Sequence, residues 1–428
     1  MKLWRKTPTR AGALYHEPDW WLLAILMTLV MFGMVMVYSS TFGIAIAEGG
    51  TPHQYLVRHV VAAGIGMLGL IIASQIDYHW LRRLAFPAMV ASLFVLAALI
   101  FVPGLGTEVF GAKSWIFVGS VSIQPSEAAK LALVLYLASW LSGKGARVKS
   151  FSYGMVQFAV VMGLLIGLVM LQPDLGTSVL LATVGLAMFF VAGANLFQFA
   201  SSLILGGAMF LTLALSASYR RDRLLVFLDP ESDLRNLGWQ LFQARLALGS
   251  GGLFGLGLGA SRQKFTWLPA PHNDAIFAII GEELGLVGCF FVLVLFCALG
   301  LRGFQIAKRA PDAFGALIAV GITTWIIFQA MFNIGGVVTA IPFTGIPMPF
   351  ISFGGSSLIV VMTAVGILLN ISRQTVRQSR PGSEGVSVEE PIRERETVAQ
   401  PTRDLTRPVP EGVKAFGRAT HQEGGRPW

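Results

Sequence analysis

Apolar runs of about 20 residues recur along most of this 428-residue sequence, and they constrain its fold more than any other feature. Each run is long enough to cross roughly 30 Å of hydrocarbon as an α-helix. The composition agrees, because 54% of the residues are hydrophobic and only 13% are charged, too few to cover a soluble globule of this size. We therefore expect an all-α polytopic membrane protein whose spans form one bundle.

Hydropathy and length predict about ten transmembrane helices. The first run follows several basic residues, but it is too long for a signal peptide, whose apolar core has about 7 to 15 residues. We therefore assign it as the first span. The expected spans cover approximately residues 20–42, 57–73, 84–102, 121–142, 152–171, 175–193, 196–218, 275–301, 313–340 and 348–371.

Lysine and arginine residues lie mostly between the apolar runs, at the N-terminus and after most even-numbered spans. The positive-inside rule then places both termini in the cytoplasm, and this role explains the net charge of +9 better than a nucleic-acid partner does. A long loop, about 219–273, falls on the extracytoplasmic side between spans seven and eight. We expect a cytoplasmic segment at 1–19, a membrane domain at 20–373 and a disordered cytoplasmic tail at 374–428, whose composition is too polar to bury a core.

Part of the long loop has helical periodicity. Leucine and alanine residues recur at helical spacing beside arginine and glutamine. Two interpretations are equally favoured: a helix that lies in the membrane interface, or a loop helix that covers the bundle. The apolar positions are Leu234, Leu237, Leu241, Ala244 and Leu248.

Several common sites are excluded. Cys289 and Cys297 stand eight residues apart in one apolar run, so a helix cannot join them by a disulfide. The glycines of 249–259 are not a phosphate-binding loop, because no strand precedes them and no Gly-Lys-Ser/Thr follows. The sequence has no His/Cys cluster with metal spacing and no Gly-x-Ser-x-Gly motif. We expect no organic cofactor, whereas Mg²⁺ or Mn²⁺ held by carboxylates and substrate phosphates stays open.

Ionisable residues within or beside the spans are few, and each costs a few kcal/mol unless it faces a partner or a wet cavity. Glu127 and Lys130 are three residues apart on one helical flank, where they form either a self-satisfied ion pair or part of a wet face. Asp174 begins a span, where it either caps the helix or belongs to a site. Trp115 is either an interfacial anchor or a substrate contact.

Asp274 is the most suggestive of these residues, because it stands at the start of a helix beside His272 and could take a proton from a hydroxyl. Glu282 is eight residues further, roughly 12 Å along a continuous helix, so it cannot be a direct acid/base partner of Asp274. For Glu282 and Glu283 we therefore favour a structural role, pairing with polar or basic groups of other helices.

Taken together, the motifs GAKSWI, QPSEAAKLA, QPDLGTS, FLDP, GSGGLFGLGLG, QKFTWLPAPHNDAIFAIIGEELGLVG, FNIGGV and IPFTGIPMPFISFGGSS strongly resemble the SEDS family of bacterial cell-wall proteins. The resemblance spans about residues 20–373. It implies a ten-span bundle that acts as a peptidoglycan glycosyltransferase and polymerises lipid II at the outer face of the cytoplasmic membrane. The Gln-Lys pair before the aromatic-Leu-Pro stretch, GGSSL and the charged tail resemble the division branch more than the elongation branch.

The resemblance also implies partners and site residues. The partners are lipid II, the nascent glycan, a class B penicillin-binding protein and other divisome proteins at the septum. The family's essential aspartate, in a Pro-Glu-Ala-His-Thr-Asp-Phe pattern, falls on Asp274. This chain departs from the pattern at Ala270, Pro271, Asn273 and Ala275, and His59 stands where glutamine is usual. Other characteristic motif positions are occupied by Arg58, Trp115, Glu127, Lys130 and Asp174.

Our mechanistic hypothesis makes Asp274 the general base for the acceptor's 4-hydroxyl, while cations stabilise the departing pyrophosphate. The resemblance implies a β-1,4 product formed with inversion. A lipid-linked precursor flippase or transporter and a non-catalytic division scaffold are the alternatives, since intramembrane charges also line transport paths. The candidate substrate-binding residues are Arg58, Trp115, Glu127, Lys130, Asp174, Arg220, Arg221, Lys264 and His272.

Overall fold

The computed structural model describes residues 17–109, 112–118, 121–215, 221, 225–229, 237–265 and 267–374. The predictions made for most of the N-terminal segment, for the tail after residue 374 and for Arg220 lie outside these ranges.

Ten long helices in the described part of the chain follow the order that hydropathy predicts, so the polytopic helical fold is confirmed. Seven of them, with α3 and α5 taken together with the short helical segments that precede them, are long and apolar enough to cross a membrane in full. Helices α6 and α7 have shorter apolar stretches, and α4 carries buried charges. The ten are α1 (Trp20–Ala47), α2 (Gln54–Gln75), α3 (Leu81–Phe101), α4 (Pro125–Lys144), α5 (Gln157–Leu171), α6 (Leu175–Val191), α7 (Leu196–Leu215), α10 (Ile276–Arg309), α11 (Ala313–Val337) and α12 (Gly355–Arg373).

Shorter elements join these helices. A 3-10 turn, η1 (Tyr78–Trp80), precedes α3, and a second, η2 (Gly145–Lys149), leads into a π-helical turn, η3 (Phe151–Val156), before α5. The long loop contains α9 (Leu237–Ser250) and η5 (Gln263–Phe265).

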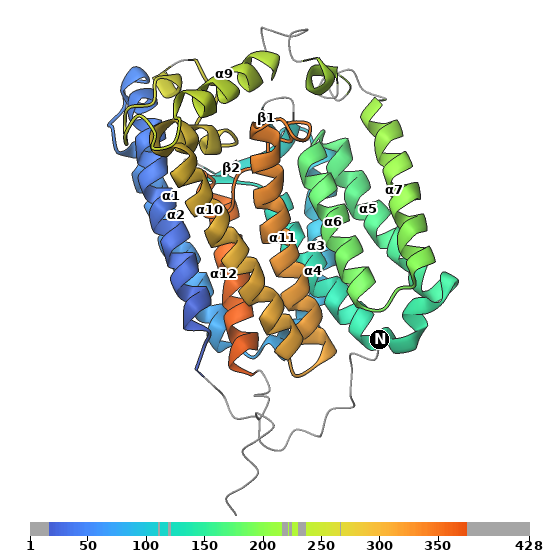
Figure 1. Cartoon of the computed structure of the whole chain (residues 1–428). Helices are drawn as coiled ribbons and strands as arrows, with labels where there is room; N and C mark the ends of the chain where they lie inside the picture. The colour runs from blue at the N-terminus through green and yellow to red at the C-terminus, as the bar shows by residue number, and fades with distance from the viewer. Residues whose placement is uncertain are drawn as a thin grey trace, which may run out of the picture. The chain divides into compact units, whose positions relative to one another are not determined.

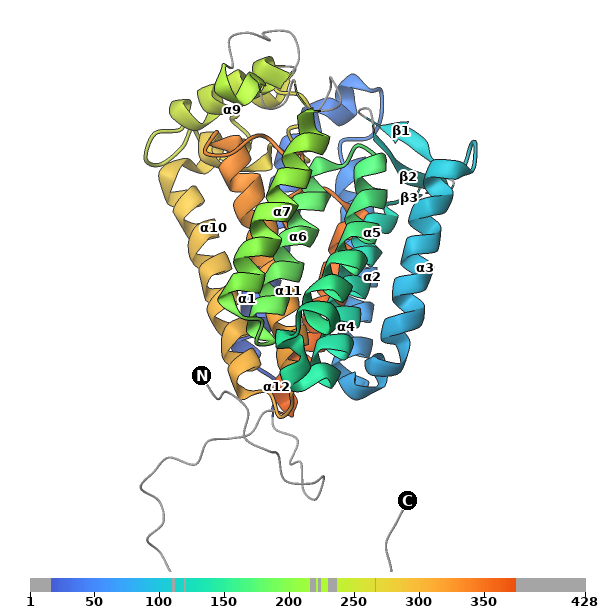
Figure 2. The ribbon, with the colours of Figure 1, turned by 90° about the vertical axis from the view of Figure 1, so that its right-hand side faces the viewer.

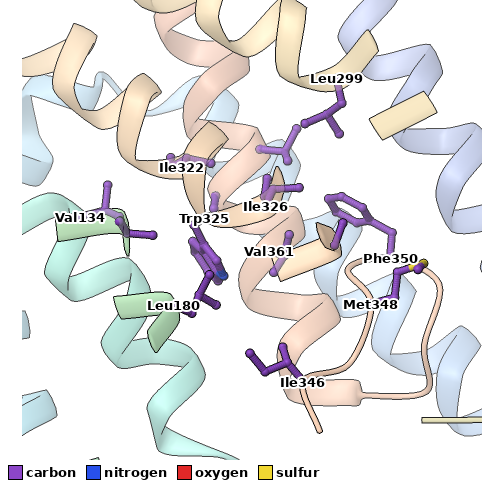
Figure 3. Packing of buried hydrophobic residues seen from close by; sticks show 14 of the residues in the cluster. Val134, Leu180, Leu299, Ile322, Trp325, Ile326, Ile346, Met348, Phe350 and Val361 are labelled. Atoms are coloured by element: carbon purple, nitrogen blue, oxygen red, sulfur yellow. The ribbon is translucent and has the colours of Figure 1, made fainter. Parts of the chain in front are cut away.

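Helix α11 is the central helix of the bundle, since 83% of its most apolar window is buried, against 39% for the windows of α1 and α10. It packs against α4, α6, α10 and α12. Trp325 is fully buried on the side of α11 that faces Val134 of α4 and Leu180 of α6 (Figure 3). Polar side chains on this helix therefore lie away from lipid and can join several segments at once.

A small sheet occupies the connection between α3 and α4, which an all-α prediction misses (Figure 2). Strands β1 (Thr107–Val109), β2 (Ala112–Val118) and β3 (Val121–Ile123) pair antiparallel in the order β1-β2-β3. The predicted start of the fourth span near 121 is wrong for this reason. Proline suits the first turn of a helix, and α4 begins at Pro125.

The last span also begins later than predicted, at Gly355 rather than near 348. A proline disfavours helical geometry in the residue before it, and Pro347 and Pro349 keep the preceding chain irregular. The segment between α11 and α12 therefore stays open, and its carbonyl groups are available to side chains of α11.

Helix α9 lies across one end of the bundle in both views (Figures 1 and 2). It packs against α10, and Leu241, Ala244 and Ala247 are buried. These contacts favour the interpretation of α9 as a cover of the bundle over that of a free interfacial helix. Leu234 of the predicted repeat lies outside the described residues.

Helix α10 is broken at Gly285, whose φ of +68° is left-handed. A glycine-rich segment, residues 251–257, lies against the break and pairs with it through the main chain. A Cβ on Gly255 would collide with the carbonyl of Glu283, and the φ of Gly255 is +79°. The glycines therefore serve close backbone packing. The four hydrogen bonds run from Leu256 N to Glu282 O (2.9 Å), Gly257 N to Glu283 O (3.0 Å), Leu286 N to Gly252 O (3.0 Å) and Val287 N to Leu253 O (3.1 Å).

Candidate functional site

Three polar side chains on one face of α11 organise the candidate site. Trp325, Gln329 and Asn333 follow one another at intervals of four residues, so they lie along the same face of the helix. All three are at most 3% exposed. Each contacts a group outside its own turn of the helix, as described next.

Gln329 is the centre of a buried hydrogen-bond network. Its Oε1 accepts from Lys130 Nζ at 3.0 Å and from Trp325 Nε1 at 2.7 Å, and its Nε2 donates to the carbonyl of Pro347 at 2.9 Å. The Lys130 ammonium also lies 5.1 Å from the Trp325 ring centre, a cation–π distance. Gln329 thus joins α4 to the segment before α12.

Glu127 and Lys130 form an ion pair, one of the two alternatives that their spacing allows, with 2.8 Å between Glu127 Oε1 and Lys130 Nζ. Both side chains are buried. Breaking such a pair by removing one partner would leave an uncompensated buried charge. The second oxygen of Glu127 and the hydroxyl of Ser126 are buried without a hydrogen-bond partner among the described residues. These two oxygen atoms at the start of α4 can therefore still accept hydrogen bonds.

Asp174 caps α6, as its position predicts, by accepting a hydrogen bond from Thr177 N at 2.9 Å. Its carboxylate also interacts electrostatically with the charges of Lys130 and Glu127. The start of α6 is therefore close to the ion pair of α4, and a Cβ on Gly176 would touch the carbonyl of Thr344 in the segment before α12.

Asp274 is half-buried in the turn that precedes α10. Its carbonyl oxygen accepts from Asn333 Nδ2 at 2.9 Å, and the same amide donates to the carbonyl of Ile346 at 2.8 Å. Asn333 therefore holds the turn that carries the predicted general base. Through α11, this turn is connected to the Gln329 network that holds Lys130.

His272 lies between two aromatic rings, with centroid distances of 5.4 Å to Tyr55 and 5.7 Å to Phe353. The amide of Phe353 donates to the carbonyl of His272 at 2.9 Å, which fixes the same turn from the side of α12. Burial lowers the pKa of His272 to about 4, so the imidazole is neutral at pH 7.

Lys264, predicted as a substrate cation, is buried in an ion pair, as Lys130 is. Its Nζ lies 2.7 Å from Glu283 Oε1, and Ser39 of α1 donates to the same carboxylate. Glu282 accepts from Ser261 Oγ and from Arg262 N. The structural pairing predicted for the two glutamates is confirmed, although their partners come mainly from the long loop.

The other predicted substrate-binding residues that the structure describes are not part of the hydrogen-bond network around Gln329. Arg58 is exposed on α2 near Tyr55, Arg221 is exposed in the long loop, and Trp115 is half-buried in β2. In the described ranges, no three His, Cys, Asp or Glu side chains gather into a metal-binding group.

Sequence reasoning missed Gln329, because a single polar residue in an apolar run gives no sign of its partners. Asn333 lies within the FNIGGV motif, but the motif alone gives this residue no role. A search for uncharged polar residues four apart in the same span would have found both.

Comparison with known proteins gives a consistent result. The profile of the FtsW, RodA and SpoVE family, described as cell cycle proteins, matches residues 19–377. Stage V sporulation protein E of Bacillus subtilis is 42% identical over 357 residues, which cover 83% of this chain and 97% of that protein. A probable peptidoglycan glycosyltransferase FtsW of Trichlorobacter lovleyi is 39% identical over 356 residues, covering 83% and 93% of the two chains.

Solved structures share the fold. A chain from a structure described as a peptidoglycan synthase complex that coordinates polymerization and crosslinking superposes with a TM-score of 0.68 and 29% identity, covering 84% of this chain and 99% of that one. The rod shape determining protein RodA of Thermus thermophilus gives a TM-score of 0.63 and 30% identity, with coverage of 84% and 98%.

Proposed function

Because this chain belongs to the SEDS family, the group of FtsW, RodA and SpoVE, we propose that it is a peptidoglycan glycosyltransferase that polymerises lipid II. The similarity to proteins named as peptidoglycan glycosyltransferases supports this activity, and it extends over 83% of the chain. Reaction takes place at the extracytoplasmic face of the membrane, the side on which the positive-inside rule puts the long loop.

One observation carries the assignment of the reacting groups. Asp274 and Lys130 are held by Asn333 and Gln329, which stand one turn apart on the same face of α11. Asp274, through its main-chain carbonyl, and Lys130, through its ammonium, are thereby both bonded to one helix, and a carboxylate base and a cation are the groups that sugar transfer from a pyrophosphate can use.

In the proposed reaction, the Asp274 carboxylate takes the proton of the acceptor's 4-hydroxyl as that oxygen attacks the anomeric carbon. The new C–O bond forms on the face opposite the leaving group, the bond to the lipid pyrophosphate breaks, and the configuration inverts. The pyrophosphate leaves as an anion, stabilised by cationic groups such as Lys130. This chemistry needs no second carboxylate close to Asp274, in agreement with the structural role of Glu282.

We also propose a class B penicillin-binding protein as partner and a role in septal synthesis. The likeness to a chain of a peptidoglycan synthase complex supports the first, and the FtsW relatives support the second. Lipid II supplies both the donor and the growing strand.

The test is polymerisation of purified lipid II by this protein with its partner in liposomes. Asp274→Asn should abolish glycan synthesis, whereas Asp19→Asn, the same change at the start of α1, should leave it intact because asparagine also caps helices. Full activity of Asp274→Asn would contradict the base assignment. Movement of labelled lipid across the bilayer without polymer would favour a flippase instead.

A further inference from the structure

Asn333 and Gln329 are buried polar residues with no charge of their own, yet each is bonded to groups outside α11. Burial of an amide is costly unless its donors and acceptors are satisfied. Asn333 Nδ2 makes two hydrogen bonds, and Gln329 makes three. Asn333 Oδ1 is buried without a partner among the described residues, so the bonds that link separate segments of the chain offset the cost of Gln329 and only part of the cost of Asn333.

The two side-chain amides donate hydrogen bonds to the carbonyls of two consecutive residues. Asn333 donates to Ile346 O and Gln329 to Pro347 O, so successive turns of α11 hold successive residues of the segment before α12. The four-residue spacing places the two amides about 6 Å apart along the helix axis. The same two amides also hold the main-chain carbonyl of Asp274 and the ammonium of Lys130.

Among uncharged side chains, only an amide NH₂ group can donate both bonds of Asn333. A carboxylate at this position has no donor, and an aliphatic side chain has neither donor nor acceptor. The requirement for an amide at this position therefore comes from hydrogen bonding and not from packing. The two N–H donors of this one side chain bind the turn of Asp274 and the segment before α12.

We infer that Asn333 and Gln329 are positioning residues that set the separation between the proton-accepting carboxylate of Asp274 and the ammonium of Lys130. The inference rests on the proposed glycosyl transfer. Neither residue needs to touch the substrate. Loss of either leaves both reacting groups present but misplaced, so the rate of the bound complex falls while substrate affinity changes little.

The central experiment compares Asn333→Leu with Asn370→Leu. Asn370 is a matched control, because it is also buried, donates to Ser74 O at 2.8 Å and accepts from Tyr78 N at 3.1 Å, but at the opposite end of α12. Both variants should lower thermal stability in detergent. Per folded molecule, Asn333→Leu should lower kcat on lipid II by about 10- to 100-fold with KM within about twofold, whereas Asn370→Leu should keep kcat within about twofold.

A double-substitution cycle separates positioning from a general folding defect. If Asn333 acts through Asp274, Asn333→Leu should lower the polymerisation rate less in an Asp274→Glu background, whose carboxylate is already displaced, than in the wild-type protein. A second cycle, with Gln329→Met and Lys130→Met, tests the link between Gln329 and Lys130 in the same way. This cycle tests the positioning role if Asn333→Leu fails to fold.

Two outcomes would overturn the inference: equal loss of kcat in the two asparagine variants, or additive losses in the cycles. Both require an active wild-type protein. Failure of the wild-type protein and its partner to polymerise lipid II would instead overturn the proposed function, so the two failures are distinguishable.

Discussion

Lys264 Nζ lies 2.7 Å from Glu283 Oε1, and both side chains are buried, at 3% and 0% exposure. This ion pair joins the long loop to α10 two residues before its break. Because Ser39 donates to the same carboxylate, α1 is joined at the same point. The pair therefore connects three segments that approach the candidate site.

Substitution Lys264→Met should destabilise the protein by about 3–5 kcal/mol, because it leaves the Glu283 charge buried without compensation. Adding Glu283→Gln should recover most of the loss. Thermal unfolding in detergent measures both, with Lys308→Met as an exposed control that changes little. Equal melting temperatures for the Lys264 and Lys308 variants would refute the structural importance of the pair.

Substitution Gly255→Ala should destabilise more than Gly252→Ala. Both glycines have a left-handed φ, +79° and +53°, which costs about 1–2 kcal/mol for alanine. At Gly255 the new methyl group also meets the Glu283 carbonyl, whereas at Gly252 it meets open space. The difference between the two melting temperatures isolates the close approach, and no difference would contradict it.

The burial of His272 predicts a specific pH dependence. Its pKa is about 4 in the folded protein, against 6.5 for an exposed imidazole, so between these pH values only the unfolded chain gains the proton. Stability from this group is therefore fully present above pH 6.5, declines as the pH falls toward 4, and falls no further below that.

His272→Phe, which keeps a ring between Tyr55 and Phe353, should remove this decline. The measurement is the melting temperature of wild type minus variant at about pH 7.5 and about pH 5, on either side of the unfolded pKa. Taking this difference removes the effect of the other titrating groups on the melting temperature, because the two proteins share them. The difference should shift in favour of the variant at the lower pH, and a constant difference would rule out the buried neutral imidazole.

Asp312 forms a second polar cluster at the other end of α11, where it caps the helix through Gly315 N and contacts His79 Nε2 at 2.6 Å. Burial opposes its ionisation, but the hydrogen bonds from His79 and Gly315 outweigh burial and hold the pKa of Asp312 below its usual value. Its stabilising effect is present above the unfolded pKa of about 4 and is lost as the pH falls through the folded pKa.

Asp312→Asn keeps a capping side chain but removes the charge beside His79. We expect a loss of roughly 1–2 kcal/mol at about pH 7, and a smaller loss at about pH 3, below the unfolded pKa, where the unfolded wild-type chain binds the proton more readily than the folded one. Unfolding temperatures at the two pH values test this. A loss that does not diminish in acid would show that capping geometry, not charge, explains the effect.

Hydropathy predicts the helices well because membrane crossing is a local requirement that each segment must meet alone. It fails at residues 107–123, where short strands in the connection between α3 and α4 look like the beginning of an apolar run. It also fails at Gly285, since an interior glycine gives no sign that a distant segment will satisfy the backbone at a break.

The residues of the candidate site likewise fall into two groups, those that the sequence reveals and those that it does not. Asp274 and the Glu127–Lys130 pair can be found from the sequence, because charges near an apolar run are conspicuous. The roles of Gln329 and Lys264 cannot, because they depend on partners that are far away along the chain, Lys130 at 199 residues from Gln329 and Ser39 at 225 residues from Lys264.

The pairing of residues 251–257 with the break in α10 gives this loop the constraints of a strand. Each of its hydrogen bonds joins a fixed residue of the loop to a fixed residue of the helix. Adding or deleting one residue would move every donor away from its acceptor at once. We therefore expect its length to tolerate change as poorly as the register of a central β-strand, although surface loops commonly accept insertions.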